Sequence, residues 1–248
     1  MTDVETVKDP SKVGKEFKNK ITFNGIPYET SVFLAPLTPD SDGYKYIVNK
    51  FSTRKQFDKT KGKMVTCLGT TASIVKSQLD TVNVSAYVFV NESKKASSDQ
   101  ASGSLQVFNW SVDLSAPAQA WICDLCRNAP DPSKKSASSP IKPTMHLFEQ
   151  LAHYVFGKPE SYLMVNKHNE SDLRPIYEKY GYVVDTGFAM RDDDGEHIVM
   201  KKTIVPDPGY ASFPFITSPK RTRSRKSTKR RKTSKSSSSS PKSLSLKP

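Results

Sequence analysis

Apolar and polar side chains alternate in the middle of the chain. Every second residue of 82–90 is Val or Ala, and a period of two is typical of a half-buried β-strand. Residues 105–112 and 120–126 are two further apolar segments bounded by polar or turn-forming residues. Because loops separate the three segments, the pattern predicts three consecutive strands in an antiparallel meander.

The hydrophobic period becomes helical after this meander. In residues 144–155 apolar side chains recur at intervals of three or four, and Gly157 follows as a C-cap. A second helix of residues 173–180 ends at Gly181. Short strands are predicted at 161–165, 182–191 and 197–204, and an Asp-Gly step typical of a tight hairpin joins the last two.

The N-terminal half is less regular. Residues 1–20 are polar, and 21–37 are typical of extended chain, with 30–34 as the first core strand. Helical spacing predicts helices at 44–57 and 71–79. Together with the later elements, this order predicts an α/β fold whose mixed, mostly antiparallel sheet is flanked by helices.

Positive charge is concentrated at the C-terminal end. Residues 218–248 hold 12 of the 38 Lys and Arg residues and none of the 25 Asp and Glu residues. The remaining 217 residues carry 26 basic against 25 acidic side chains, so the net charge of +13 belongs almost entirely to this tail. We therefore predict a flexible N-terminus (1–20), one domain (21–217) and a disordered basic tail (218–248).

The composition of the tail suits polyanions. Its Lys and Arg side chains can neutralise phosphates of DNA or RNA without reading the bases. Two basic clusters, residues 220–226 and 229–232, also fit a nuclear import signal. A tail that only solubilises the protein is the alternative. We expect localisation in the nucleus or on nucleic acid, a virion included.

The rest of the sequence excludes several classes of protein. No apolar run approaches the roughly 20 residues that a membrane span needs, and the N-terminus lacks the apolar segment of a secretory signal. Three cysteines, an odd number, argue against a disulfide framework and for a reducing compartment. We therefore expect an intracellular protein without a membrane partner.

The C-terminal half resembles a known family. Asn169 and the segment Tyr-Glu-Lys-Tyr-Gly-Tyr at 177–182 resemble the N…YEKxGF signature of the GNAT superfamily of N-acetyltransferases. In this resemblance, residues 121–127 correspond to the fourth strand and 162–165 to the fifth, and the match covers roughly 81–204. It implies an acyl-CoA N-acyltransferase-like fold and transfer of acetyl from acetyl-CoA to an amine, such as a protein lysine.

The resemblance also implies that acetyl-CoA lies between the fourth and fifth strands, with its pyrophosphate at a helix N-terminus. Residues 128–143 contain no glycine where the family has a glycine-containing loop, and Pro140 supplies no N–H. Either Lys134, Lys135 and Lys142 compensate as point charges, or the loop binds no cofactor. The implied cofactor-binding residues are Leu125, Arg127, Lys135, Ser136, Ser138, Ser139 and Asn169.

Two residues are candidates for catalysis. Tyr177 matches the tyrosine that protonates the departing coenzyme A thiolate, and a phenol is a suitable acid for that step. An aromatic packed on the inner face of the helix is the alternative. Asp124 is the candidate general base toward the amine, or else an exposed strand carboxylate. Asn169 lies near the cofactor, as the resemblance implies, or caps the following helix, which we favour.

Cys123 and Cys126 form a CxxC motif without the second pair that zinc sites need. In a regular strand their offset of three places the thiols on opposite faces, so we predict no metal site. Two functions remain open. The first is an acetyltransferase, favoured by Tyr177 and Asn169. The second is an inactive protein of this fold that acts as a nucleic-acid-binding or virion-associated protein through its basic tail.

Overall fold

The computed structural model describes residues 14–58, 62–67, 71–81, 84–92, 100–109, 115–128, 140–192 and 195–213. Internal contacts divide the chain into the unit Met1–Ser218 and the unit Pro219–Pro248, and every described residue belongs to the first. The predicted disordered tail and the predicted pyrophosphate-loop residues Lys135, Ser136, Ser138 and Ser139 therefore lie outside the described residues.

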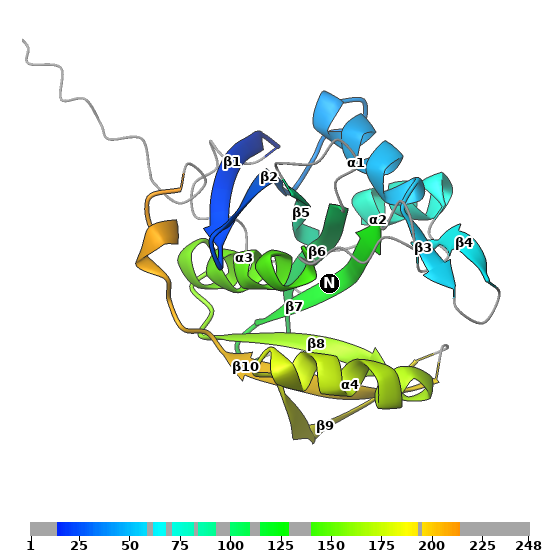
Figure 1. The fold of residues 1–248 in the computed structure, drawn as a ribbon, viewed down its shortest axis with the longest axis vertical. Helices are drawn as coiled ribbons and strands as arrows, with labels where there is room; N and C mark the ends of the chain where they lie inside the picture. The colour runs from blue at the N-terminus through cyan, green and yellow to red at the C-terminus, as the bar shows by residue number, and fades with distance from the viewer. Residues whose placement is uncertain are drawn as a thin grey trace, which may run out of the picture. The chain divides into compact units, whose positions relative to one another are not determined.

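Within the described residues, eight strands form one sheet in the order β1-β2-β5-β6-β7-β8-β10-β9 (Figure 1). All neighbouring strands are antiparallel except β7 and β8, which are parallel. The strands are β1 (Glu16–Phe23), β2 (Ile26–Leu34), β5 (Val84–Glu92), β6 (Gln100–Phe108), β7 (Gln119–Asn128), β8 (Glu160–Asn166), β9 (Val183–Asp192) and β10 (Gly195–Thr203).

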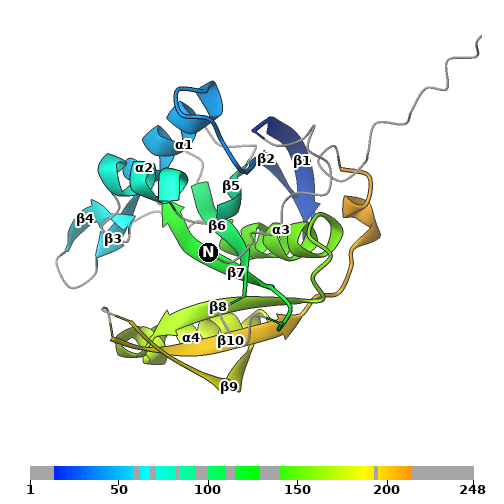
Figure 2. The same ribbon diagram turned by 180° about the vertical axis from the view of Figure 1, so that it is seen from behind.

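Two apolar cores cover the two faces of the sheet. Helix α3 (Ile141–Tyr154) and side chains of α4 (Glu170–Lys179) pack in one core with the buried residues of β6, β7 and β8. Helices α1 (Asp42–Ser52) and α2 (Ala72–Thr81) pack in the other, against β2 and β5. A separate hairpin of β3 (Lys55–Asp58) and β4 (Lys63–Thr66) follows α1 (Figure 2).

The predicted fold class is confirmed by this topology. Strands β5, β6 and β7 form the predicted meander, and α3 connects β7 to a parallel β8, so the sheet is mixed and mostly antiparallel. The predicted helix ends are also confirmed, because Gly157 and Gly181 adopt left-handed φ values of 68° and 89°. Both glycines lie shortly after the end of a helix, where any other residue would be strained by the positive φ.

The N-terminal half differs from the prediction. Strand β1 begins at Glu16, so the predicted flexible N-terminus of residues 1–20 is too long. Asn24 and Gly25, with φ of 49° and 76°, form the turn of a β1–β2 hairpin that was predicted only as extended chain. The predicted helix at 44–57 ends at Ser52, because the chain continues into β3.

No helix of the described residues is both long enough and apolar enough to cross a membrane.

Candidate functional site

Strands β7 and β8 pair over a very short distance. Only Ala120 with Ser161 and Trp121 with Tyr162 are in register in the described sheet, although both strands continue for several residues. Figures 1 and 2 show the two strands diverging toward their C-terminal ends. Parallel strands that separate in this way present unpaired backbone edges to a ligand, which makes this edge of β7 the candidate site.

A β-bulge interrupts β7 at the same place. Ser104 pairs with Cys123 and Ser102 pairs with Cys126, so two residues of β7 lie opposite Gly103. Asp124 adopts a left-handed φ of 53° within this bulge. A bulge reorients side chains and removes backbone groups from the ladder, and such features are common beside functional sites.

The carboxylate of Asp124 lies on the face of the sheet toward α1 and α2. Its Oδ2 accepts a hydrogen bond of 2.9 Å from the hydroxyl of Ser104, which is fully buried. Two further polar side chains of this face, Arg54 and Tyr87, are 1% exposed and interact electrostatically with Asp124. The predicted alternative, an exposed strand carboxylate, is therefore wrong, because Asp124 belongs to a buried polar cluster.

Burial dominates the proton equilibria of this cluster. Desolvation lowers the pKa of Arg54 to about 10, although the negative charge of Asp124 opposes this shift. Desolvation, reinforced by Asp124, raises the pKa values of the Tyr87 hydroxyl and the Cys123 thiol well above their ordinary range. At neutral pH the cluster thus holds a charged guanidinium, a neutral phenol and a neutral thiol.

The bulge also changes the position of the CxxC motif. Because one extra residue separates Cys123 from Cys126, both lie on the face of β7 that pairs with Ser102 and Ser104. The predicted placement on opposite faces, which assumed a regular strand, is wrong. Cys126 forms a disulfide with Cys67, at a Cα–Cα distance of 6.4 Å. The odd number of cysteines argued against a disulfide framework, and this disulfide corrects that expectation.

The opposite face of β7 carries two of the predicted cofactor-binding residues, Leu125 and Arg127. Leu125 packs against the core around α3, and Arg127, two residues later, lies on the same face by strand alternation. Arg127 is half-buried. Leu125 and Arg127 therefore line the same side of the diverging edge, between β7 and the start of α3.

The N-terminus of α3 offers few backbone donors. Pro140 and Pro143 supply no N–H, and the N–H of Thr144 donates to the carbonyl of Pro140 at 3.0 Å. The start of α3 therefore lacks the N–H groups of residues 140 and 143, and the N–H of Thr144 is already engaged. The Lys142 Nζ lies 5.9 Å from the ring centre of Phe23 and 5.7 Å from that of Tyr180. An anion at this helix end would therefore depend on side-chain cations.

Tyr177 belongs to the same face as Leu125. It is partly buried against the α3 core, and its ring centre lies 6.4 Å from that of Tyr182. Burial, reinforced by Tyr180, raises its pKa above the ordinary value of 10. The packed inward position that was the alternative to catalysis is thus present, and it also keeps the hydroxyl protonated at neutral pH.

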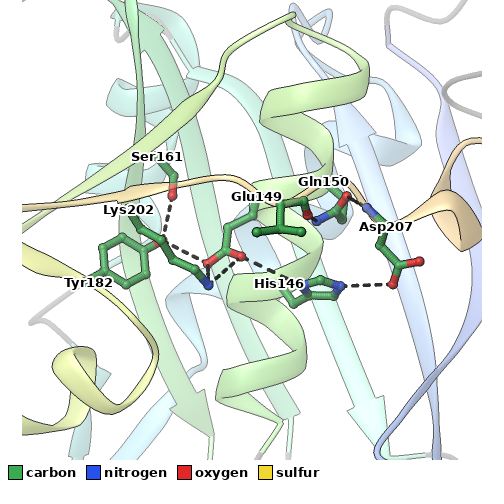
Figure 3. Close-up of polar contacts among 8 residues, drawn as sticks. His146, Glu149, Gln150, Ser161, Tyr182, Lys202 and Asp207 are labelled. Carbon is green, nitrogen blue, oxygen red and sulfur yellow. Dashed lines mark hydrogen bonds and ion pairs between the residues drawn. The ribbon is translucent and has the colours of Figure 1, made fainter.

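A buried polar network lies beside Tyr177 and was missed by sequence reasoning (Figure 3). Glu149 of α3 is 3% exposed, and both of its carboxylate oxygens lie 2.9 Å from the Lys202 Nζ. The Tyr182 hydroxyl donates to Glu149 at 3.3 Å and lies 2.9 Å from the Ser161 hydroxyl. Burial, reinforced by Glu149, raises the pKa of Tyr182 well above 10.

The network extends to the segment that follows β10. The Nδ1 of His146 lies 3.7 Å from Glu149, and its Nε2 lies 3.3 Å from the Asp207 carboxylate. Gln150 accepts a bond of 2.8 Å from the Asp207 N–H, as Figure 3 shows. These contacts connect α3 to β8, β10 and the C-terminal segment of the first unit. They therefore fix the position of α3 against the face of the sheet that includes β7.

Asn169 occupies the N-cap position of α4, but its side chain makes no capping hydrogen bond. The position predicted for Asn169 is thus correct, but the predicted hydrogen bond from its side chain to the helix N-terminus is absent. Asn166 takes that role for the short 3-10 helix Lys167–Asn169, where its side chain accepts from the N–H of His168 at 2.9 Å.

The structure thus separates the two candidate catalytic residues. Asp124 faces α1 and α2, whereas Tyr177 packs on the α3 side, and the diverging edge of β7 lies between these two faces. Sequence reasoning missed Arg54, Glu149 and the Cys67–Cys126 pair, because each depends on contacts between distant segments. In the described ranges, no group of three or more His, Cys, Asp or Glu side chains is placed to hold a metal ion.

No protein-family model and no curated protein matches the sequence. Similar solved structures include an uncharacterized protein from Bacillus halodurans, at 10% identity and a TM-score of 0.48, over 75% of this chain and 90% of that one. A putative GnaT-family acetyltransferase from Bordetella pertussis has 9% identity and a TM-score of 0.44, over 75% of this chain and 99% of that one.

A chimera of the spermidine N-acetyltransferase SpeG from Vibrio cholerae is also similar, at 9% identity and a TM-score of 0.40, over 70% of this chain and 95% of that one. All three TM-scores lie below 0.5.

Proposed function

We propose that the protein is an N-acetyltransferase that transfers acetyl from acetyl-CoA to an amine. The observation that carries this proposal is the divergence of β7 from β8 at the bulge of Asp124. The divergence gives one strand edge access to both faces of the sheet. The partly buried carboxylate of Asp124 lies on one face, and a cationic side chain and a helix N-terminus lie on the other. This arrangement suits two substrates that meet at the edge.

Acetyl-CoA binds on the α3 face in this proposal. Arg127 and Lys142 meet its phosphates, because the two prolines leave α3 with few N–H donors. Leu125 contacts the apolar part of the pantetheine arm, and the thioester lies at the unpaired edge of β7. Asn169 and the loop residues Lys135, Ser136, Ser138 and Ser139 remain predicted contacts of the cofactor, as the family resemblance implies.

The amine approaches from the α1/α2 face. Asp124 accepts a proton from the amine, whose nitrogen attacks the thioester carbonyl and forms the C–N bond. The C–S bond breaks, and Tyr177 donates its phenolic proton to the departing thiolate. One proton thereby moves in net from nitrogen to sulfur. The phenol of Tyr177 is protonated at neutral pH, since burial raises its pKa above the ordinary value of 10, so the proton for this step is present.

We propose a lysine side chain of a protein as the acceptor, because the basic tail would deliver the enzyme to nuclear or other nucleic-acid-bound proteins. The test incubates the full chain with acetyl-CoA and either a lysine-containing peptide or spermidine, and measures acetylated product by mass spectrometry. The proposal expects product with the peptide. Lack of product with every amine tried would contradict it.

Two substitutions separate the proposed roles. Asp124→Asn retains a residue that tolerates left-handed φ but removes the base, and Tyr177→Phe removes only the acid. Each is expected to lower kcat by about 100-fold. Arg174→Met is the matched control, because Arg174 forms exposed ion pairs with Glu170 and Glu178 on α4 and should leave kcat unchanged.

The two prolines at the start of α3 favour a second candidate function. A fold that has lost its backbone phosphate donors fits an inactive scaffold whose tail binds DNA or RNA. This function predicts that binding to a duplex weakens steeply with salt. It also predicts that Asp124→Asn leaves this affinity unchanged, and that acetyl-CoA does not bind even at millimolar concentration.

A further inference from the structure

Arg54 is a fully buried arginine between α1 and β3. It is 1% exposed, and its guanidinium lies 3.9 Å from the ring centre of Phe51. Arginine is among the residues least often buried completely, and a buried guanidinium must be compensated by hydrogen bonds. The bonds that Arg54 makes therefore indicate what it holds in place.

The shortest of these bonds reaches the bulge of β7. Nη1 donates to the carbonyl of Asp124 at 2.7 Å and to the hydroxyl of Ser102 at 3.1 Å. Nε donates to the carbonyl of Phe51 at 3.3 Å. Because the left-handed φ of Asp124 turns its peptide out of the regular ladder, the carbonyl of that residue needs a partner from outside the sheet, and Arg54 supplies it.

Main-chain contacts fix the position of Arg54 itself. Its carbonyl accepts a bond of 2.9 Å from the N–H of Cys67, and Cys67 is joined to Cys126 by the disulfide. The segment that carries Arg54 is thus attached to β7 at residue 124 by the guanidinium and at residue 126 by a covalent bond. These two anchors lie on either side of Leu125.

Part of the polar capacity of the cluster is unused. The Nη2 of Arg54 and the hydroxyl of Tyr87 are buried without a hydrogen-bond partner among the described residues. A buried polar atom without a hydrogen bond lowers the stability of the fold, so its presence in a native structure needs a functional or structural explanation. Both belong to side chains that interact electrostatically with Asp124, so donors are already present around the carboxylate.

We propose that Arg54 is a positioning residue for the transfer reaction. It holds the bulge by two directed hydrogen bonds, so that the Asp124 carboxylate stays on the α1/α2 face while the β7 edge stays open. This role rests on the proposed acetyltransferase function. A misplacement of about 1 Å in such a site costs roughly 100-fold in rate, and this is the loss expected in kcat for Arg54→Met.

The experiment compares Arg54→Met, Arg54→Lys and the control Arg174→Met with the unmodified full chain. Three quantities are measured for each: the Kd of coenzyme A, kcat with the lysine peptide, and hydrogen exchange of the amides of residues 123–126. Arg54→Met should keep the Kd within about threefold. It should speed exchange at residues 123–126 but not in the β1–β2 hairpin, which serves as the internal reference.

Arg54→Lys, which retains a positive charge, tests the same role if the Arg54→Met variant does not fold. A single ammonium cannot donate along both directions used by the guanidinium fork, so kcat should still fall by about tenfold or more. An active protein whose Arg54→Lys variant has unchanged kcat and unchanged exchange overturns the positioning role alone. A full chain that neither binds acetyl-CoA nor acetylates any amine overturns the proposed function and this role with it.

Discussion

The two faces of β7 are stabilised in different ways. On the α1/α2 face, Arg54 and the Cys67–Cys126 disulfide attach β7 directly to the chain before and after the β3–β4 hairpin. On the α3 face, Leu125 of β7 packs in the apolar core, and the ion pair of Glu149 with Lys202 holds α3 in position there. In the proposed function, the side that carries the base is therefore rigid, and the side that binds the cofactor depends on the position of α3.

The largest expected effect concerns the covalent anchor. Cys67 and Cys126 are separated by 59 positions in the sequence, and a loop of that size corresponds to about 4 kcal/mol in the chain-entropy model. Reduction should therefore lower the free energy of unfolding in urea by up to about that amount. Cys123→Ala, which leaves the disulfide intact, is the control. Equal stability of the oxidised and reduced protein would contradict the comparison.

The ion pair on the other face should have the next largest effect. Glu149→Leu removes the acceptor of the Lys202 ammonium and one of the two hydrogen-bond partners of the Tyr182 hydroxyl, which keeps Ser161. We expect a loss of about 3 kcal/mol in unfolding free energy. Glu178→Leu, which breaks an exposed pair with Arg174, should cost about 0.5 kcal/mol or less. Similar losses for the two variants would show that the Glu149 network does not support α3.

Gly103 of β6 lies directly opposite the bulge of β7. A Cβ at this position would lie 3.0 Å from Phe148 of α3 and 3.1 Å from the carbonyl of Cys123 in the bulge. Because the backbone of the bulge cannot shift freely, Gly103→Ala should cost about 2 kcal/mol by overpacking. Gly25→Ala is not a neutral control, since Gly25 has positive φ. Exposed Ser73→Ala in α2 serves instead.

The smallest expected effect depends on pH. Burial raises the pKa of Tyr182 above 10, so between pH 10 and that raised value the native protein retains a proton that the unfolded chain releases. Its contribution to stability is complete below pH 10 and is lost as pH rises above it. Tyr182→Phe should cost about 1 kcal/mol at pH 7 and give a flatter decline of stability above pH 10. Parallel declines in both proteins would contradict this.

Local patterns predicted much of the fold. The alternation of residues 82–90, the glycines that end α3 and α4, and the Asp-Gly step between β9 and β10 all act over a few residues. Asn24-Gly25 is an equally local hairpin signal, and it could have been recognised from the sequence. The predictions failed mainly where the outcome depends on contacts between distant segments.

The candidate site illustrates that limit. Asp124 and Tyr177 were identified through a resemblance, but nothing in the order of residues reveals that β7 has a bulge there. Arg54 resembles any other arginine in a polar segment, and arginine is usually exposed. Its partner Asp124 is 70 positions away. The same holds for Glu149, whose buried position is set by Lys202 of β10 and Tyr182 before β9.

The most direct test of the central claim is calorimetric titration of the full chain with acetyl-CoA. Salt of about 0.5 M suppresses attraction of phosphates to the basic tail. The account predicts saturable binding of one acetyl-CoA per chain. It also predicts an affinity about tenfold lower in Arg127→Met and unchanged in Arg174→Met. Absence of saturation at millimolar acetyl-CoA, or equal binding of adenosine 3′,5′-bisphosphate, would contradict it.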